Sequence, residues 1–285
     1  MLAVEGLNQS YGQFGLRDVT FSLETGYIMG FIGRNGAGKT TTLKTMMNLV
    51  AKQSGSVRML GRDFAEQEQA CKQEIGFMLG GADYYPKKRL GTIAKAVRRF
   101  YTNWDQEAYG RYLQRFGLDE SKRVDELSQG MRVKFNLALA LSHGARLLIL
   151  DEPTSGLDPV SRDSLLELFQ QLIEDGERSI LFSTHITSDL EKCADFITYM
   201  RRGEVVLSKS REELLAQYRT ARGPLAALEQ PGANRLIGVK RNAFGFYALA
   251  RTEDLPLAGV ETAAPDIETI MVHMEQEDGY ESADL

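Results

Sequence analysis

The feature that most constrains the fold is a glycine-rich loop at residues 33–40, which reads Gly-Arg-Asn-Gly-Ala-Gly-Lys-Thr and fits the pattern G-x-x-x-x-G-K-T. A short apolar run at 27–32 precedes it and predicts a buried strand, and apolar residues recur at helical spacing over 43–50. In a strand–loop–helix arrangement, the backbone N–H groups of the loop and the helix N-terminus can surround a phosphate. The loop therefore predicts an α/β fold that binds a nucleoside triphosphate.

The polar side chains of this loop have expected tasks. Lys39 would reach the β- and γ-phosphates of the nucleotide, and the Thr40 hydroxyl would hold Mg²⁺. We expect the other nucleotide contacts from the residues around them, namely Asn35, Gly36, Ala37, Gly38 and Thr41.

A second motif lies at residues 147–152, where four aliphatic residues lead into two acids. The aliphatic residues predict a buried strand, and in open α/β sheets the carboxyl ends of the strands form the ligand-binding edge. We expect Asp151 to position Mg²⁺, largely through water, because this ion keeps much of its hydration shell. Glu152 is the residue expected to orient or polarise the attacking water.

Composition and charge limit the class of protein. Of the 285 residues, 43% are hydrophobic and 26% are charged, as in soluble domains, and no stretch reaches the ~18 uncharged apolar residues of a spanning helix. Residues 1–5 lack the pattern of a signal peptide, and Cys71 and Cys193 lack metal-binding spacing, so we expect buried cysteines in a cytoplasmic protein. The net charge of −5 argues against nucleic acid as a partner.

Between the two motifs, residues 127–131 read Leu-Ser-Gln-Gly-Met and precede an apolar, helix-forming run. The sequence also has an aromatic residue at Tyr11, Ser-Gly-Leu-Asp at 155–158, and His185 after an apolar run. In this order the motifs resemble those of ATP-binding-cassette (ABC) nucleotide-binding domains. The run at 100–105, the form of the signature and the run at 183–189 are most similar to the bacterial YtrB-like exporter ATPases.

The resemblance implies an ATPase that binds ATP and Mg²⁺ between two cassettes and drives a separate transmembrane permease subunit. It implies that Tyr11 stacks on adenine and that His185 contacts the γ-phosphate. In the family the signature acts on the nucleotide of the opposite protomer, so Ser128 and Gly130 would complete the site of a partner in a homodimer or heterodimer. Asp158 resembles the aspartate of the dimer contact. The implied location is cytoplasmic, on the inner face of the cell membrane.

Several of these residues also fit simpler roles. Ser128 suits a helix cap as well as a phosphate site, and Asp158 before a proline suits ordinary loop chemistry. Two departures from the family pattern matter more. Gly80 stands where the family usually has a glutamine that helps to bind Mg²⁺ and to contact the permease, and we expect nearby Asp83 to take over part of the metal role through water. The signature has Gln129 and Met131 where glycine and glutamine are commonest.

The motifs also predict how the chain is organised. Residues 1–218 are expected to form an ABC-type P-loop NTPase core with a helical subdomain inserted at about 76–145, in which Asp105 caps a helix. Residues 219–285 are expected to form a small α+β accessory region with a frayed acidic tail. An apolar stripe over 267–274 predicts a helix in that region that contributes to its core.

Two other functions remain open from the residues alone. One is a soluble ABC ATPase without a transport role, and the other is an ATP-gated regulatory module with little turnover. Glu152 argues against the regulatory module, whereas Gly80 is compatible with it. The transported substrate and its direction do not follow from the sequence.

Overall fold

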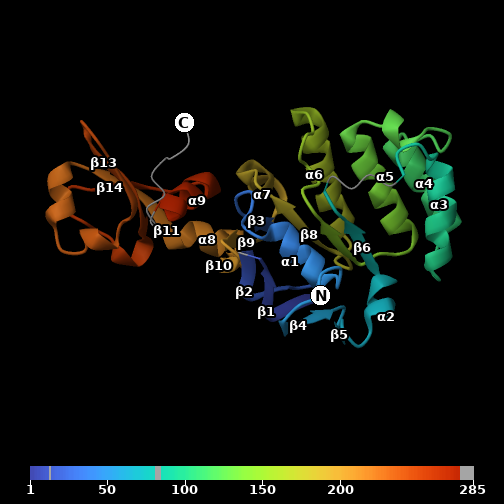
Figure 1. Cartoon of the computed structure of the whole chain (residues 1–285). Helices are drawn as coiled ribbons and strands as arrows, with labels where there is room; N and C mark the ends of the chain where they lie inside the picture. The colour runs from blue at the N-terminus through green and yellow to red at the C-terminus, as the bar shows by residue number, and fades with distance from the viewer. Residues whose placement is uncertain (13, 81–84, 277–285) are drawn as a thin grey trace. The chain divides into compact units, whose positions relative to one another are not determined.

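The computed structural model describes residues 1–12, 14–80 and 85–276, and the chain divides into two compact units, Met1–Ser208 and Lys209–Leu285 (Figure 1). The division lies earlier in the chain than residue 218, where the last cassette motifs led us to expect it. Each unit has its own sheets, helices and apolar core.

Six strands form the larger sheet of unit 1: β3 (Ile28–Ile32), β6 (Ile75–Met78), β7 (Leu147–Leu150), β8 (Ser179–Thr184), β9 (Phe196–Arg201) and β10 (Glu204–Ser210). Their order across the sheet is β10-β9-β3-β8-β7-β6, and the pairs from β9 to β6 are parallel. Strands β3, β7 and β8 are buried along their whole length. A parallel sheet covered on both faces favours such continuous apolar sequences.

The strands of a smaller antiparallel sheet come before and after β3 in the chain. It consists of β1 (Leu2–Tyr11), β2 (Phe14–Leu23), β4 (Ser54–Met59) and β5 (Arg62–Asp63), in the order β2-β1-β4-β5. In β2 the buried side chains alternate with exposed ones towards the end of the strand, as expected for a sheet with one face in the core.

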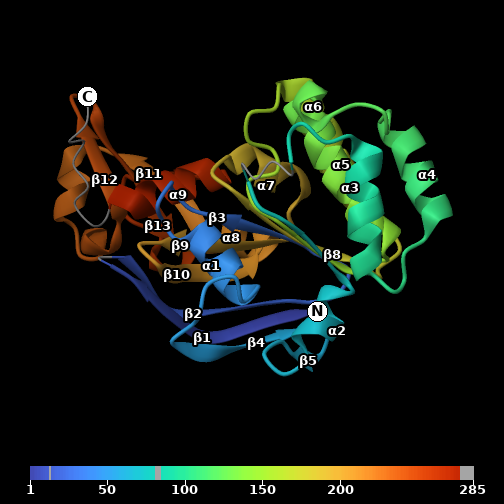
Figure 2. The same ribbon diagram turned by 45° about the vertical axis from the view of Figure 1, so that its right-hand side comes forward.

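The helices of unit 1 connect these strands along the chain (Figure 2). They are α1 (Lys39–Met46), α2 (Glu68–Lys72), α3 (Leu90–Val97), α4 (Gln106–Phe116), α5 (Gln129–Ser142), α6 (Pro159–Ile173) and α7 (Thr187–Cys193), with short 3₁₀ turns η1 (Arg98–Phe100) and η2 (Val124–Glu126). Helices α3, α4 and α5 lie side by side at the green side of the unit, with α5 in contact with both others.

Helix α4 illustrates how the sequence sets its ends. The Asp105 side chain accepts hydrogen bonds from the backbone N–H groups of Glu107 and Ala108, as the sequence predicts. The helix ends at Gly117, whose φ of 63° is in the left-handed region that favours glycine. Trp104, just before the cap, packs on Tyr109 with ring centroids 5.3 Å apart and so forms a hydrophobic staple.

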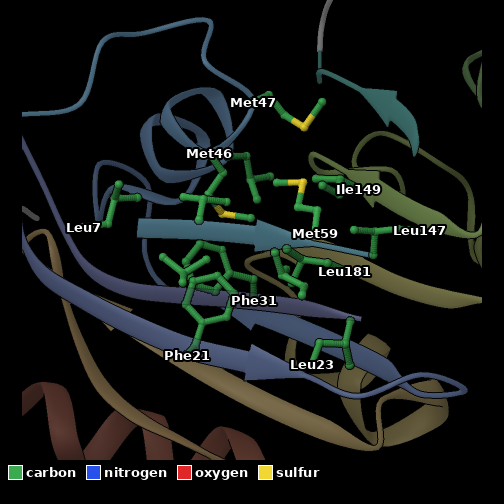
Figure 3. Packing of buried hydrophobic residues seen from close by; sticks show 14 of the residues in the cluster. Leu7, Phe21, Leu23, Phe31, Met46, Met47, Met59, Leu147, Ile149 and Leu181 are labelled. Carbon is green, nitrogen blue, oxygen red and sulfur yellow. The ribbon is translucent and has the colours of Figure 1, made fainter. Parts of the chain in front are cut away.

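The main core of unit 1 joins the two sheets and α1 (Figure 3). Phe21 of the antiparallel sheet stacks on Phe31 of β3 with ring centroids 5.3 Å apart. The free cysteine Cys71 is buried in the same core, and Cys193 is buried in α7, which confirms the prediction that both are buried. Packing on this core fixes β3 and α1, and so holds the loop between them in place.

Unit 2 is a four-stranded antiparallel sheet with one longer helix on it. The strands are β11 (Tyr218–Gly223), β12 (Ile237–Asn242), β13 (Gly245–Arg251) and β14 (Glu261–Ala263), in the order β12-β13-β11-β14. The helices are α8 (Arg211–Gln217) and α9 (Ile267–Gln276), with 3₁₀ turns η3 (Leu225–Glu229), η4 (Ala233–Arg235) and η5 (Thr252–Asp254). Helix α9 packs on β12 and β13 with Ile267, Ile270, Met271 and Met274 buried, which confirms the predicted core stripe.

Candidate functional site

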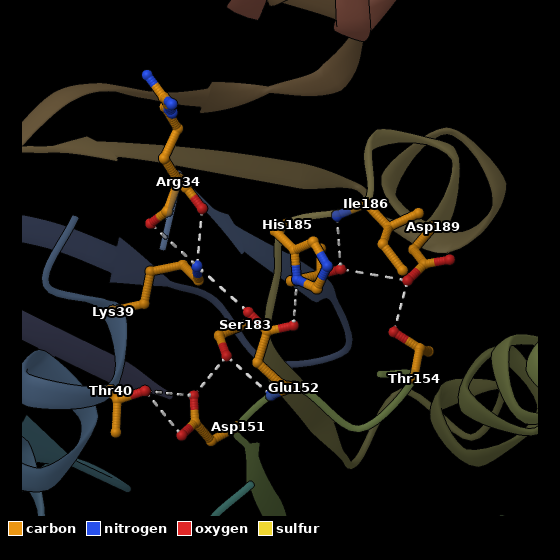
Figure 4. A network of polar contacts seen from close by, with 12 residues as sticks. Arg34, Lys39, Thr40, Asp151, Glu152, Thr154, Ser183, His185, Ile186 and Asp189 are labelled. Atoms are coloured by element: carbon orange, nitrogen blue, oxygen red, sulfur yellow. Dashed lines mark hydrogen bonds and ion pairs between the residues drawn. The ribbon is translucent and has the colours of Figure 1, made fainter. Parts of the chain in front are cut away.

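Three chain segments meet at one edge of the central sheet, where parallel strands end (Figure 4). The glycine loop follows β3, the pair Asp151 and Glu152 follows β7, and His185 follows β8. Because β8 lies between β3 and β7 in the sheet, residues far apart in the sequence come within hydrogen-bond distance. This edge is where α/β sheets bind ligands.

The glycine loop has a conformation that larger residues could not adopt. A Cβ atom on Gly33 would lie 2.3 Å from the carbonyl oxygen of Met200, and Gly36 and Gly38 have φ values of 82° and 113°. Gly38 also begins α1 without a side-chain cap, so no side chain competes for the first N–H groups of the helix. These N–H groups form a receptor for an anion.

Lys39 lies under this loop and is only 5% exposed. Its ammonium group donates a 2.7 Å hydrogen bond to the carbonyl oxygen of Gly33 and forms an ion pair with Glu152 Oε1 at 3.2 Å. A buried ammonium at the mouth of an anion-binding loop has the charge and position to bind phosphate oxygens, which would compete with Glu152 for it.

Asp151 is nearly buried and is held by two hydroxyl groups. Thr40 Oγ1 lies 3.1 and 2.9 Å from its two carboxylate oxygens, and Ser183 Oγ donates a 2.6 Å hydrogen bond to Oδ1. The same Ser183 oxygen accepts a 2.9 Å hydrogen bond from the backbone N–H of Glu152. Ser183 therefore fixes both acids, a role that the sequence analysis missed because Ser183 lies within a strand that looks purely structural.

The oxygen atoms of Thr40 and Asp151 fit a hard cation such as Mg²⁺. No cluster of three or more His, Cys, Asp or Glu side chains suitable for a metal occurs within the described ranges. A cation held here would therefore take its other ligands from water and from phosphate oxygens, which is the usual coordination of Mg²⁺ in nucleotide sites. Asp83 falls outside the described residues, so its expected part in metal binding stays a prediction.

Glu152 and His185, which follow β7 and β8, are in direct contact. Glu152 Oε2 lies 2.8 Å from His185 Nδ1, while its other oxygen faces Lys39. The backbone of Glu152 has a φ of 49°, a left-handed conformation that costs a residue with a side chain about 1 kcal/mol or more. Such strain at a carboxylate that joins a lysine and a histidine is typical of a functional site.

A second network lies behind these residues and was not expected from the sequence. The Asp189 carboxylate in α7 is fully buried and accepts hydrogen bonds from the hydroxyls of Thr154, at 2.6 Å, and Thr184, at 3.2 Å. Thr184 Oγ1 in turn accepts from the backbone N–H of Ile186. Burial raises the pKa of Asp189, opposed by the two hydroxyls and by Arg162 at 3.9 Å. The network braces the loops on both sides of Glu152 and His185.

Gly80 lies beside the acidic pair, as the family alignment implies. A Cβ atom on Gly80 would lie 2.9 Å from the carbonyl oxygen of Asp151 and 3.5 Å from Glu152 Cβ. The chain just after β6 thus approaches the chain just after β7 so closely that glycine fits best here. The backbone of Tyr11 ends β1, but its side chain lies outside what the structure describes, so adenine stacking stays a prediction.

The signature lies at the start of α5, and Asp158 lies at the start of the neighbouring helix α6. Ser128 and Asp158 are both exposed. Ser128 caps α5 and accepts a 3.3 Å hydrogen bond from the backbone N–H of Met131. Asp158 caps α6 and accepts from the N–H groups of Val160 and Ser161. Hydrogen bonding with the Ser161 side chain, and then with the backbone of Ser161 and Val160, lowers the pKa of its carboxyl. Both residues therefore have the simpler capping role, and both remain exposed to a second molecule.

None of the helices in the described part of the chain combines the length and apolarity needed to cross a bilayer.

The chain is similar in sequence and in fold to known ATP-binding proteins. The sequence profile of the ABC transporter family matches residues 16–155. The chain is 30% identical over 203 residues to the ABC transporter ATP-binding protein YtrB of Bacillus subtilis, covering 71% of this chain and 69% of YtrB. It is 32% identical over 212 residues to the lantibiotic transport ATP-binding protein SrtF of Streptococcus pyogenes, covering 73% and 90%. A solved ATP-binding subunit of an ABC transporter superposes with a TM-score of 0.68 at 27% identity, covering 76% and 92%.

Proposed function

The chain belongs to the family of ABC transporter ATP-binding proteins, and from that premise we propose that Lys39, Glu152 and His185 form one half of its ATPase site. The protein is an ATP-binding and ATP-hydrolysing subunit of a transporter. Its family and its named relatives favour this function over a non-transport ATPase and over a regulatory module.

The observation that carries the proposal is the position of the Glu152 carboxylate between Lys39 and His185, at 3.2 and 2.8 Å. When phosphate oxygens bind Lys39, the Glu152 carboxylate keeps its contact with His185 and faces the space beyond the γ-phosphate. From there it can accept a proton from an attacking water. His185 orients that carboxylate and supplies a polar contact to the γ-phosphate.

In this proposal Mg²⁺ supplies a second positive charge at the phosphates, beside that of Lys39. Thr40 and Asp151 would hold it, with Ser183 fixing the Asp151 carboxylate from behind. Bound there, the ion would neutralise the negative charge of the β- and γ-phosphates. Asp83→Ala is expected to raise the Mg²⁺ concentration for half-maximal activity, and an unchanged Mg²⁺ dependence would remove Asp83 from the metal site.

The other half of the site would come from a second cassette. Ser128 and Gly130 lie far from the phosphate loop in the sequence, at the start of α5, where Ser128 is exposed and Gly130 is partly exposed. Hydroxyl and N–H groups at a helix start suit a γ-phosphate. We propose that they act on the nucleotide of a partner, either a second copy of this chain or a related subunit.

ABC ATP-binding subunits act with transmembrane permeases. The relatives include SrtF, whose name assigns it to lantibiotic transport. We propose that this chain likewise binds a permease at the inner face of the membrane and supports export.

Phosphate release by the purified chain tests the ATPase proposal. Glu152→Gln keeps the shape of the side chain and removes its charge, so turnover should fall by about 100-fold or more. Glu177→Gln, in the exposed turn after α6, is the matched control and should keep wild-type turnover. Equal activity of both variants would reject Glu152 as the base. Identification of membrane subunits that co-purify with the chain tests the permease proposal.

A further inference from the structure

The turn between β12 and β13 carries the most exposed large apolar side chain in the described structure. Phe244 is 96% exposed, so it touches almost no neighbour and projects from the end of the sheet. The pair Asn242 and Gly245 closes a two-residue turn, and Asn242 Oδ1 accepts a 2.8 Å hydrogen bond from the backbone N–H of Phe244. The turn is therefore built to hold this side chain outwards.

A second apolar segment lies beside that turn. A Cβ atom on Gly245 would lie 2.2 Å from the carbonyl oxygen of Gly223 and 3.5 Å from Pro224 Cα. The start of η3 therefore adjoins the turn, and its residues Pro224, Leu225 and Ala226 are exposed, Leu225 by 46%. Together with Ala243 and Phe244 these residues form an exposed apolar group, which we call the hairpin tip.

The charges on the two strands that flank the turn are positive. The sequence from 230 to 252 has no aspartate or glutamate and contains four basic residues. Two of these, Arg235 and Arg251, pair with acids from η5. Lys240 and Arg241, next to the turn, are exposed and have no ion-pair partner among the described residues. Two uncompensated cations thus lie behind the apolar tip, in a chain whose net charge is negative.

We propose that the hairpin tip is an anchor for an anionic lipid surface, with Phe244 entering the headgroup region and Lys240 and Arg241 binding lipid phosphates. An exposed aromatic ring with adjacent cations is suited to a membrane interface, where the ring leaves water and the cations remain at the anionic surface. A lipid surface also needs no complementary pocket, whereas a protein interface normally covers a broad patch of matched shape. The hairpin tip belongs to unit 2 and shares no residue with the ATPase site of unit 1.

The test uses the full chain, whose single native tryptophan can be replaced so that a new one reports on the tip alone. In a Trp104→Phe background, Phe244→Trp places a fluorescent reporter at the tip. We expect its emission to shift to the blue with vesicles of phosphatidylcholine containing roughly a quarter phosphatidylglycerol, and not with phosphatidylcholine alone. The shift should weaken as salt is added, because salt screens the exposed cations.

Sedimentation with the same anionic vesicles measures the contribution of each part. Phe244→Ser should lower the bound fraction by about tenfold, and Lys240→Gln with Arg241→Gln by at least about tenfold. Matched controls are Val272→Ser, at an exposed apolar position on α9, and Lys87→Gln with Lys88→Gln, which removes two exposed charges from unit 1. Both controls should bind like wild type, and all variants should keep ATPase activity.

Two results would overturn the proposal. One is equal sedimentation of the wild type and the tip variants with no blue shift of the reporter. The other is a dimer that forms without lipid and is lost in Phe244→Ser, which would assign the tip to a second copy of the chain.

Discussion

Asp189 and Thr154 join the two loops that carry the reacting groups of the candidate site. The fully buried Asp189 carboxylate accepts a 2.6 Å hydrogen bond from the Thr154 hydroxyl, two residues after Glu152. Through Thr184, the same carboxylate holds the backbone just before His185. Asp189 thus sets the relative position of two side chains that it does not touch.

Replacement of Asp189 by alanine should lower both stability and turnover. The change leaves two buried hydroxyls without an acceptor and Arg162 without its carboxylate, so the free energy of unfolding should fall by about 3 kcal/mol. We expect kcat to fall further than KM changes, because the effect is on the alignment of Glu152 and His185 and not on nucleotide contacts. Denaturant unfolding and steady-state ATPase kinetics measure the two effects.

Asp189→Asn is the informative companion to that variant. Asparagine retains one acceptor oxygen and should recover much of the stability. If Asp189→Asn is as stable as wild type yet remains slow at saturating ATP, the charge contributes to positioning. Wild-type kcat in Asp189→Ala would show that the network serves the fold alone.

Lys39 and Glu152 should separate nucleotide binding from turnover. Lys39→Ala removes a cation from the phosphates in the ground state and in the transition state, so ATP affinity should fall by about 10- to 100-fold. Glu152→Gln should leave affinity close to wild type and act on kcat. Titration of a fluorescent ATP analogue measures affinity in both, and equal weakening in the two variants would contradict these roles.

The γ-phosphate should hold two cassettes together when hydrolysis is blocked. Glu152→Gln with MgATP is expected to form a dimer by light scattering, whereas MgADP is not, because only ATP provides the γ-phosphate that we propose Ser128 and Gly130 to bind. Ser128→Asp retains an oxygen to cap α5 but adds a negative charge, so it should abolish the dimer while the fold persists. A single mass under all conditions would argue against a homodimeric sandwich.

Gly80 should resist replacement by the family's usual glutamine. Its Cβ would lie 2.9 Å from the Asp151 carbonyl oxygen, and that contact is with backbone, which cannot move aside cheaply. Gly80→Ala and Gly80→Gln should each lose about 1–3 kcal/mol of stability and several-fold in turnover, because Asp151 and Glu152 shift. A gain of ATPase activity in Gly80→Gln would mean that the chain after β6 relaxes readily and that the missing side chain limits hydrolysis.

Local signals in the sequence account for much of the fold. The strand at 147–150, the cap at Asp105 and the core stripe of α9 depend on neighbouring residues or on helical period, and the structure confirms each. The strand expected at 27–32 begins one residue later, at Ile28. Tyr27 lies outside the strand and is 41% exposed. Such local rules do not fix where the compact units divide, which depends on contacts between distant segments.

The site was predictable only in part, for the same reason. Lys39, Asp151, Glu152 and His185 belong to motifs, and parallel pairing of β3, β8 and β7 brings them together. Ser183 and Asp189 lie in the run at 183–189 that resembles the family, but their roles did not follow from it, since their partners lie about 30 residues away in the chain. A polar residue at the end of an otherwise apolar strand and a buried acid four residues after His185 are the signals that could have indicated them.

His143 should make the stability of the protein depend on pH between about 4 and 6.5. The ring is buried at the end of α5, stacks on Tyr101 with centroids 3.7 Å apart, and has Nδ1 3.1 Å from the carbonyl oxygen of Gln73. Burial lowers its pKa from 6.5 to about 4. Between these values the unfolded chain binds the proton and the folded chain does not, so stability is lost as pH falls, by at most about 3 kcal/mol.

Urea unfolding of wild type and His143→Gln across this pH range isolates that contribution. Glutamine keeps a donor for the Gln73 carbonyl and does not titrate, so the variant should be less stable than wild type at pH 7 and should lose less stability on acidification. His273, whose pKa is also lowered by burial, is present in both proteins and cancels in the difference. Parallel pH curves for the two proteins would mean that the His143 ring does not remain neutral in the fold, and that the Tyr101 stack accommodates its charge.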